Sequence, residues 1–259
     1  MTVIRSVSRA SRILVHLAEQ QESRTAKQIA AAVDLPLPTA YHLLGTLVGE
    51  GLLTKDSGRQ YQLGPALAAI TDAYMRQFTP PDYLVGPLRQ LAETSGETAY
   101  VGCWRHNRLA VLASVEGRNA VRVSGVHIGF VASGHARASG KVLLAFAPDS
   151  LREAYLLENP LDAVTPRTIV EPGELRLELE RTRLRGFAVD EEEFREGVAC
   201  VAAPLLESGF PVAAYSISAP VERFRRRRQE MIDLVVETTR QAATDGGRRP
   251  DPRPPVSAS

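Results

Sequence analysis

The segment 38–50 carries small and polar side chains that recur on one face of a predicted helix. They are Thr39, Tyr41, His42, Gly45 and Thr46. Hydroxyl, phenol and imidazole groups can donate or accept hydrogen bonds. Base edges present such partners in a DNA major groove, which is about 12 Å wide and admits one helix. Two cations that could contact phosphates follow, Lys55 and Arg59. The pattern predicts a helix that reads base edges, with basic groups beside it.

Three predicted helices position this face. The third helix is segment 38–50 itself, and Pro38 suits its first turn because a missing N–H costs no hydrogen bond there. Its inward stripe at helical spacing is Ala40, Leu43, Leu44, Leu47 and Val48. Thr25 is of a type that favours the N-cap, so we expect it to start the second helix. The second helix would bury Ile29, Ala30 and Val33.

The first helix and a hairpin complete the predicted unit. The helix, from Ser6 to about Gln20, would bury Val7, Ala10, Leu14 and Leu17. The hairpin is formed by segments 52–55 and 61–63, which are joined by a turn at 56–59. Three helices followed by a basic-tipped hairpin are the layout of a winged helix-turn-helix, so we expect binding to double-stranded DNA. Three-helix units with a hairpin also serve as protein–protein modules, and that alternative stays open.

The predicted DNA contacts divide by chemistry. We assign Thr39, Tyr41 and His42 to base edges, and Arg9, Lys55 and Arg59 to phosphates. The full predicted set is Arg9, Thr25, Lys27, Pro38, Thr39, Tyr41, His42, Thr46, Lys55 and Arg59. Residues 1–64 hold seven basic and five acidic side chains. Counterion release scales with the phosphates neutralised, so this weak charge favours an oligomer that multiplies the contacts.

Composition places the chain among globular proteins. It has 259 residues, 44% hydrophobic and 24% charged, with a formal net charge of +1. No apolar run of about 18 residues predicts a membrane span, and no secretion signal opens the chain, so we expect a cytoplasmic protein. Cys103 and Cys200 lie far apart in sequence and are expected to be reduced thiols.

Beyond residue 64 the pattern predicts a linker and a second domain. The linker helix, 65–80, carries an apolar stripe of Leu67, Ile70, Tyr74 and Phe78, which suggests pairing with another copy. Segment 81–245 is predicted to be α+β, with one sheet covered mainly on one side by helices. Its predicted strands are 97–104, 109–115, 120–124, 187–190, 198–206 and 212–218. Its predicted helices are 84–94, 141–147, 150–157, 172–185 and 221–244.

Two charged or polar segments at the end of the chain need separate interpretation. The run Arg223–Arg228 could be a second nucleic-acid site, but a solvated helix start explains it better. Cations are unfavourable at a helix N-terminus, so we expect acidic partners near it. The tail 246–259 is rich in Pro, Gly, Arg and Ser and is expected to be disordered.

Segment 186–204, GFAVDEEEFREGVACVAAP, is the most distinctive linear motif. With the N-terminal layout, the segment SGKVLLA at 139–145 and the segment SISAP at 216–220, it resembles the IclR family of bacterial transcription regulators. The resemblance covers Ser6 to about Thr244. It implies a winged helix-turn-helix (1–64), a linker helix and a GAF-like effector-binding domain, assembled as a homodimer or a dimer of dimers.

The resemblance also implies a pocket for a small organic effector over the sheet of the second domain. The matching positions here are Ala132, Ser133, His135, Ala138, Ser139, Asp190, Val198, Cys200, Ser216 and Ser218. Ser216 and Ser218 share one face of a strand by its two-residue period. Backbone N–H groups at Ala138 and Ser139 would form an anion-binding corner at a helix start. The Asp190 carboxylate would repel a nearby anion unless it is neutralised or caps backbone amides.

The function expected from these features is that of a ligand-responsive repressor that binds a palindromic operator, with a carboxylate or aromatic effector and no cofactor. Relatives often carry Pro where this chain has Ser133, and Arg where it has His42. One alternative is an enzyme or metal-dependent domain, in which Cys200 acts with His127 or His135, or binds Zn²⁺ with Asp190. No paired His or Cys spacing supports a metal site, and we predict no catalytic residue. Another alternative is a DNA-binding protein whose second domain only oligomerises.

Overall fold

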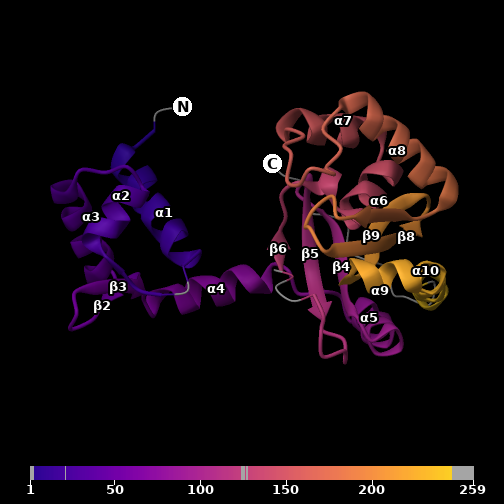
Figure 1. Cartoon of the computed structure of the whole chain (residues 1–259), viewed down its shortest axis with the longest axis horizontal. Helices are drawn as coiled ribbons and strands as arrows, with labels where there is room; N and C mark the ends of the chain where they lie inside the picture. Colours follow the sequence, from indigo (N-terminus) through magenta and orange to yellow (C-terminus); the bar gives the residue numbers. More distant parts are fainter. Residues whose placement is uncertain (1–2, 21, 124–125, 127, 247–259) are drawn as a thin grey trace. The chain divides into compact units, whose positions relative to one another are not determined.

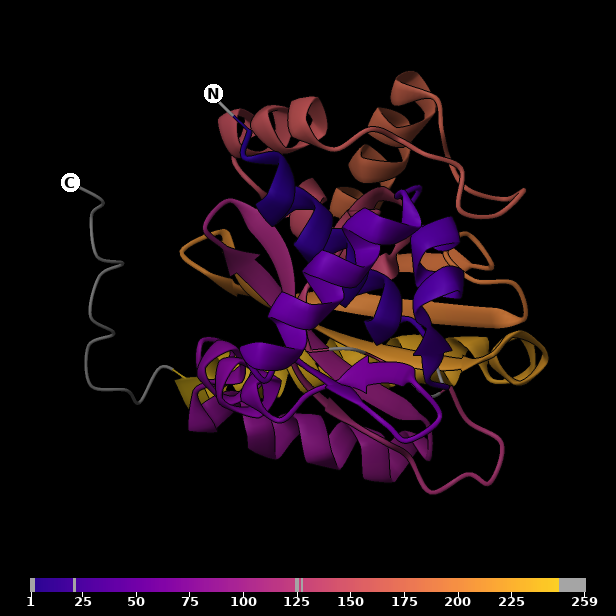
Figure 2. The same ribbon diagram turned by 90° about the vertical axis from the view of Figure 1, so that its left-hand side faces the viewer.

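The computed structural model describes residues 3–20, 22–123, 126 and 128–246, and the chain divides into two compact units (Figures 1 and 2). Unit 1 is 1–77 and unit 2 is 78–259. The predicted tail 246–259 lies outside the described residues except for Gly246, and so does His127. Within the described part of the chain, no helix is long and apolar enough to cross a bilayer.

Unit 1 contains the three predicted helices and the predicted hairpin. Its helices are α1 (Arg5–Ala18), α2 (Ala26–Ala32), α3 (Leu37–Gly49) and α4 (Ala66–Arg76). Its strands are β1 (Arg24–Thr25), β2 (Leu53–Lys55) and β3 (Gln60–Leu63). The hairpin of β2 and β3 gains a third antiparallel strand, because β1 pairs with β3. Two residues are too few to show a strand pattern, so sequence reasoning missed β1.

The core of unit 1 corrects one predicted residue. Val7 is 60% exposed, whereas Ile13 is fully buried and takes the central position on the inner face of α1. The prediction for Val7 was wrong because Val7 lies in the first turn of α1, outside the core of unit 1. The inward residues of α2, Ile29, Ala30 and Val33, are buried as predicted.

Unit 2 is built on one six-stranded antiparallel sheet in the order β6-β5-β4-β9-β8-β7. The strands are β4 (Thr98–Arg105), β5 (Arg108–Val115), β6 (Gly129–Phe130), β7 (Ala188–Glu191), β8 (Val198–Glu207) and β9 (Phe210–Pro220). The helices are α5 (Asp82–Ser95), α6 (Ala138–Phe146), α7 (Asp149–Glu158), α8 (Pro172–Arg185), α9 (Val221–Arg226) and α10 (Arg228–Gly246). A single 3₁₀ turn, η1 (Gly134–Ala136), precedes α6.

Helices cover both faces of this sheet, so the prediction of helices mainly on one side was wrong. Figures 1 and 2 show α5 and α10 on one face, and α6, α7 and α8 on the other. Alternating residues of β8 separate accordingly: Val201 packs into the core under α5 and α10, and Cys200 and Ala202 pack into the core under α6. Both faces of β8 and β9 are apolar, a pattern typical of a doubly covered sheet.

Two predicted elements differ in the structure. Residues 120–123 form no strand, and the edge strand is instead the short β6, which pairs with β5. The predicted helix 221–244 breaks at Arg227, whose φ of −114° and ψ of 23° leave the helical region. The Arg227 guanidinium instead donates to the carbonyl of Ser95, at 2.9 Å, and to the carboxylate of Glu230. This tertiary contact overrides the helical periodicity of the sequence.

Candidate functional site

The outer face of α3 presents polar side chains to solvent. Tyr41 is 53% exposed, His42 and Thr46 are exposed, and Thr39 is half buried. Among the described residues, no atom outside the local helix backbone lies within 4 Å of a Cβ built on Gly45, so the space beside Gly45 is open. The opposite face packs Ala40, Leu44 and Leu47 into the core. This arrangement leaves the face predicted to read bases free to approach a ligand.

The hairpin presents its two predicted phosphate contacts at exposed positions. Lys55 ends β2, and its Nζ lies 5.4 Å from the centroid of the Tyr61 ring. Arg59 follows the turn with a φ of 60°, in the left-handed region. The turn is held by the Asp56 carboxylate, which accepts the backbone N–H of Gln60 at 2.8 Å. The hairpin therefore holds its cations on an ordered backbone.

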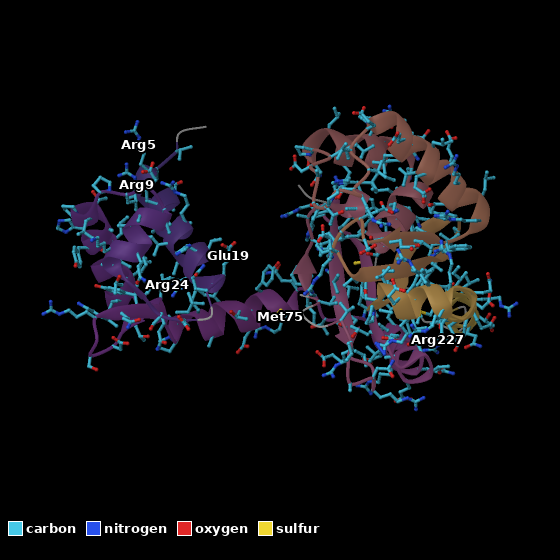
Figure 3. All side chains as sticks on the ribbon, viewed as in Figure 1. Arg5, Arg9, Glu19, Arg24, Met75 and Arg227 are labelled. Carbon is cyan, nitrogen blue, oxygen red and sulfur yellow. The ribbon has the colours of Figure 1, made fainter. Side chains whose placement is uncertain are left out.

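The remaining predicted DNA contacts lie on α1, at the start of α2 and at the start of α3. Arg9 is half buried in the N-terminal half of α1 (Figure 3), and Lys27 and Pro38 are exposed. Thr25 caps α2 as predicted. Its hydroxyl accepts the backbone N–H of Gln28 at 3.4 Å, and the Gln28 side chain accepts the N–H of Thr25 at 2.9 Å. This capping box fixes the start of α2.

A cavity of about 150 Å³ lies in unit 2 between the α6 face of the sheet and the loop 191–197. Its lining residues are Tyr100, Val111, Val123, Val126, Val131, Arg137, Asp190, Phe194, Arg195, Val198, Cys200 and Ser218. Four of the ten residues predicted to bind an effector line it, namely Asp190, Val198, Cys200 and Ser218. A cavity of this volume in a protein core is large enough for one benzene ring.

Six predicted residues do not line this cavity: Ala132, Ser133, His135, Ala138, Ser139 and Ser216. His135 is buried, and its Nε2 lies 3.1 Å from the carbonyl oxygen of Asp162. Burial lowers the pKa of this imidazole, which favours the neutral form. Ser216 and Ser218 are both buried on the same face of β9, as predicted, but only Ser218 reaches the cavity. No described atom makes a hydrogen bond to Ser216 Oγ.

Asp190 caps the loop that closes the cavity. The side chain is 2% exposed, and its Oδ1 accepts the backbone N–H groups of Glu193 at 2.8 Å and Phe194 at 3.2 Å. Burial raises the pKa of this carboxyl to about 6, against the opposing effects of Lys141 and of these N–H groups. The carboxylate thus has the amide-capping role that would reduce its repulsion of an anion.

Cys200 is a buried thiol and not an activated one. Its Sγ lies 2.9 Å from Ser218 Oγ, and burial raises the pKa of the thiol to about 12. A nucleophilic cysteine needs a depressed pKa, so the environment disfavours the reactive thiolate. Among the residues that the structure describes, no hydrogen bond joins Cys200 to His135, and no group of three His, Cys, Asp or Glu side chains could bind a metal ion.

Sequence reasoning missed Arg137, which lines the cavity from the N-cap position of α6. Its guanidinium carbon lies 3.4 Å from the centroid of the Phe194 ring, and its Nε donates to the carbonyl of Ala132 at 3.1 Å. The missed Tyr100 enters through β4, where it pairs with Ser216 of β9. Arg137 directly precedes Ala138 and Ser139, which were predicted to bind an anion, and Phe194 belongs to the distinctive motif, so their positions in sequence were a usable signal. The pairing of Tyr100 with β9 leaves no comparable signal in the sequence.

A buried ion pair holds the loop 191–197 against α6. Lys141 is 1% exposed, and its Nζ donates to the carbonyl of Val189 at 2.7 Å and to Glu193 Oε1 at 2.5 Å. Burial raises the pKa of the Glu193 carboxyl, and the Lys141 charge opposes that shift. Phe194, which lines the cavity, directly follows Glu193 in the sequence. The ion pair therefore fixes this part of the cavity wall to the interior.

The backbone beside Arg137 is tightly packed. A Cβ added at Gly140 would collide with the carbonyl oxygen of Gly134, and one added at Gly134 would lie 2.7 Å from the hydroxyl of Tyr155. Real Cβ contacts are longer than this, so neither site accepts a side chain without movement. Gly140 therefore allows η1 to lie directly against α6, and Gly134 allows Leu109 and Tyr155 to lie directly against η1.

The arginine run 223–228 has the acidic partners that were expected. Arg225 pairs with Glu191 at 2.7 Å, and Arg228 pairs with the same carboxylate at 2.8 Å. Arg223 pairs at 2.7 Å with Glu97, which is fully buried. The run therefore has a structural role in joining α9 and α10 to the rest of unit 2.

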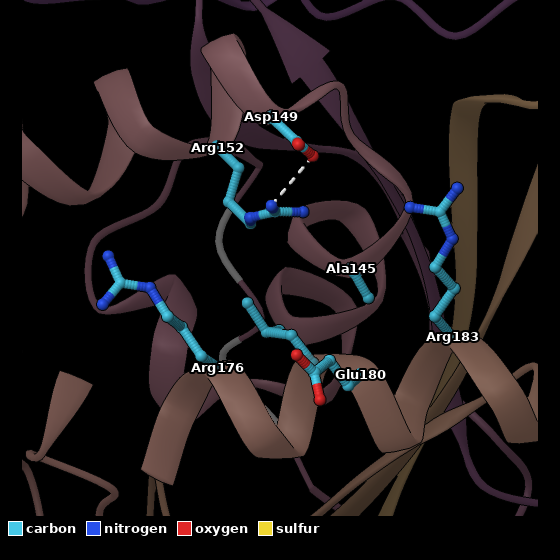
Figure 4. A pocket seen from close by; sticks show the side chains of 7 residues that line it. Ala145, Asp149, Arg152, Arg176, Glu180 and Arg183 are labelled. Atoms are coloured by element: carbon cyan, nitrogen blue, oxygen red, sulfur yellow. Dashed lines mark hydrogen bonds and ion pairs between the residues drawn. The ribbon is translucent and has the colours of Figure 1, made fainter. Parts of the chain in front are cut away.

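A second cavity, of about 180 Å³, lies among α6, α7 and α8 (Figure 4). Arg152, Arg176 and Arg183 line it, together with Asp149, Glu180, Ala145 and Leu179. Arg152 pairs with Asp149 at 2.9 Å, and Arg176 pairs with Glu153 at 3.1 Å. None of the predicted effector-binding residues lies here, and acidic neighbours already neutralise two of the three cations.

Comparison with known proteins assigns both units. Residues 6–57 match the IclR helix-turn-helix domain, and residues 84–245 match the C-terminal domain of the bacterial transcriptional regulator IclR. The chain is 34% identical over 250 residues to the glycerol operon regulatory protein of Streptomyces coelicolor, covering 94% of this chain and 97% of that protein. It is 31% identical over 251 residues to the transcriptional repressor AllR of Klebsiella pneumoniae, covering 95% and 91%.

A solved structure shares the fold. An IclR homologue of Microbacterium hydrocarbonoxydans, complexed with 4-hydroxybenzoate, superposes with a TM-score of 0.68 at 23% identity, covering 93% of this chain and 98% of that one. The fold agrees with the predicted α+β class, with an N-terminal helix-turn-helix and a C-terminal effector-binding domain. The chain belongs to the IclR family of bacterial transcriptional regulators.

Proposed function

We propose that this chain is a cytoplasmic repressor that binds a palindromic or pseudo-palindromic operator and responds to a small organic effector. Its exposed α3 face would read bases through Thr39, Tyr41 and His42. Arg9, Lys55 and Arg59 would contact phosphates, and Thr25, Lys27, Pro38 and Thr46 would lie against the duplex. The observation that carries the proposal is that one chain combines this exposed polar helix face with a cavity lined by buried polar groups.

The similar proteins support repression and control by a small molecule. AllR of Klebsiella pneumoniae is named a repressor, and the structural neighbour is complexed with 4-hydroxybenzoate. Control would be a population shift, in which an effector that prefers one arrangement of the assembly changes its affinity for the operator. The shift cannot exceed the effector's difference in affinity between the two arrangements.

An oligomer, a homodimer or a dimer of dimers, is part of the proposal. Unit 1 has little excess positive charge, so a single copy neutralises few phosphates. On α4, Ile70 is 57% exposed and Tyr74 is 38% exposed, which suits pairing with a second copy. Two recognition helices about one DNA turn apart would then read two half-sites.

The test is a selection of genomic DNA fragments with the full-length protein, followed by footprinting of the fragment bound most tightly. We expect one protected site with two-fold symmetry. Thermal melting in the presence of carboxylic acids and phenols should then identify compounds that also change operator affinity. Binding without any preference over random DNA would contradict the proposal. A specific operator with no response to any compound would favour a second domain that only oligomerises.

A further inference from the structure

Arg137 lines the 150 Å³ cavity and supplies a cation that could bind a ligand there. Arg137 is half buried, and the loss of solvent lowers the pKa of its guanidinium. An arginine stays protonated in proteins, so the site keeps a partly desolvated positive charge. Such a charge is costly unless it is paired or hydrogen-bonded.

The contacts of Arg137 use only part of its hydrogen-bonding capacity. Nε donates to the carbonyl of Ala132, and the guanidinium plane lies over the Phe194 ring. Among the described residues, neither terminal nitrogen has a hydrogen-bond partner, and no ion pair joins Arg137 to a carboxylate. Asp190 lines the same cavity, but its Oδ1 already accepts two backbone N–H groups. Two parallel N–H donors therefore remain, in the geometry that binds a carboxylate.

The rest of the wall limits what else the guest can carry. Val111, Val131 and Val198 give apolar surface, and Tyr100 and Ser218 give hydroxyl groups. The volume fits one ring or an aliphatic body of similar size. A second carboxylate on the guest would lie in the same small cavity as Asp190, where like charges repel.

We propose that Arg137 selects the effector, by binding the carboxylate of a monoanionic ligand whose body is a single ring or an equally small apolar group. The inference rests on the proposed function for its biological meaning, since it names the effector class of that cavity. It also adds Arg137 to the ten predicted effector-binding positions, none of which is an arginine or a lysine.

The experiment measures binding of simple probes to the full-length protein. The probes are benzoate and 4-hydroxybenzoate, their neutral amides, and the dianion terephthalate. Calorimetry measures the affinity of each probe, and the ¹⁵N signal of Arg137 Nε reports contact with this side chain. We expect the two monocarboxylates to bind and to shift that signal. The amides and terephthalate should bind more weakly than benzoate, by about tenfold or more. Equal binding of benzoate and benzamide would overturn the proposal. So would the absence of any shift with both monocarboxylates and with acetate and hexanoate at millimolar concentration.

Three variants separate recognition from folding. Arg137→Met should weaken benzoate binding about 10- to 100-fold, the range for a lost charge-assisted hydrogen bond. Arg137→Lys should fall between the two because it keeps the charge but loses the planar pair of donors. Arg183→Met, which removes an arginine from the other cavity, should bind benzoate as the unaltered protein does. Retention of full affinity in Arg137→Met would overturn the assignment.

Operator binding distinguishes failure of this inference from failure of the proposed function. If benzoate binds through Arg137 but does not change operator affinity, the inference stands and effector control is wrong. If operator affinity responds only to a neutral compound, effector control stands and the role of Arg137 is wrong.

Discussion

The surface of unit 1 that we propose to bind DNA and the cavity of unit 2 place their polar groups in opposite environments. Tyr41 is 53% exposed, and Lys55 and Arg59 lie on an exposed hairpin. Asp190 is 2% exposed, Cys200 is 7% exposed, and burial raises the pKa of both groups. Charges exposed to water are screened, and they contribute binding energy only when a ligand such as DNA contacts them. Charges in the cavity already carry large desolvation energies, so unit 2 should respond far more strongly to single substitutions.

The largest expected effect is the loss of the buried ion pair. Lys141→Met leaves the Glu193 carboxyl without its cation in the interior, and removal of one partner of such a pair costs about 3–5 kcal/mol. Urea unfolding followed by fluorescence of Trp104, the one tryptophan of the chain, reports this loss in unit 2. The double variant Lys141→Met/Glu193→Met should recover most of the stability.

Unit 1 offers the matched control. Arg24 pairs with Glu22 at 3.4 Å at the surface, where the Glu22 side chain is 82% exposed. Glu22→Gln should therefore change stability by less than about 1 kcal/mol. A larger loss from Glu22→Gln than from Lys141→Met would break the contrast between the two units.

The next effect is a pH dependence that comes from Asp190. Its pKa rises from 3.8 to about 6 on folding, so the folded state binds more protons between these values and stability falls as the pH rises through them. Two pKa units correspond to about 3 kcal/mol. The carboxyl is surrounded by Lys141, Glu193, Arg137, Tyr100 and Cys200. The measurement must therefore separate the contribution of Asp190 to the pH dependence from theirs.

Asp190→Asn provides that isolation because its amide oxygen can still accept the N–H groups of Glu193 and Phe194. The difference in unfolding free energy between the protein and this variant should change by about 2.4 kcal/mol between pH 4 and pH 7, because part of the pKa shift lies below that range. A difference that stays constant with pH would show that Asp190 has an ordinary pKa in the folded protein.

The third effect belongs to the exposed surface and requires DNA. His42→Ala should cost about 1–3 kcal/mol at one base position of the operator and little on random DNA, because a base contact is lost. Lys55→Ala should weaken binding to all sequences and lower the salt slope by about one. Titrations of operator and random DNA at several salt concentrations test both. Equal losses on the two DNAs for His42→Ala would refute its assignment to a base edge.

The smallest effect tests the capping box of α2. Thr25→Ala removes the hydroxyl that accepts the N–H of Gln28 and should lower the stability of unit 1 by about 1 kcal/mol. Thr46 is an exposed residue inside α3 whose hydroxyl donates to the carbonyl of His42, so Thr46→Ala is a control with almost no expected loss. Far-UV circular dichroism during thermal unfolding measures both variants. An equal loss in the two variants would remove the cap as the cause.

Sequence reasoning predicted unit 1 better than the cavity, and the reason is the distance in sequence over which contacts form. The helices of unit 1 follow from local periodicity and from Thr25 as a cap, so the start of α2 and both ends of α3 were found to within one residue. The cavity joins β4, the start of α6, the loop 191–197 and β8. Asp190, Cys200 and Ser218 were found because they belong to linear motifs. The place of Tyr100 in the cavity depends on the pairing of β4 with β9, which no local pattern shows.

The division of the chain into a DNA-binding part, a linker, an effector-binding part and a tail stays a prediction, as do the individual DNA and effector contacts. Two of the structural predictions that failed did so because packing overrode local pattern. The break at Arg227 follows from its contact with Ser95, and the second helical layer depends on α6, whose sequence alone does not say which face of a sheet it covers.

The paired glycines at 134 and 140 restrict how this protein could be retargeted. Every replacement of Gly140 adds a carbon where the main chain of Gly134 already lies, so the close packing of η1 on α6 beside Arg137 depends on this glycine. Variation that keeps the fold can therefore change only the groups that project from this scaffold. A library aimed at new ligands for the cavity should randomise the residues at 100, 111, 131, 137 and 198 and leave both glycines untouched.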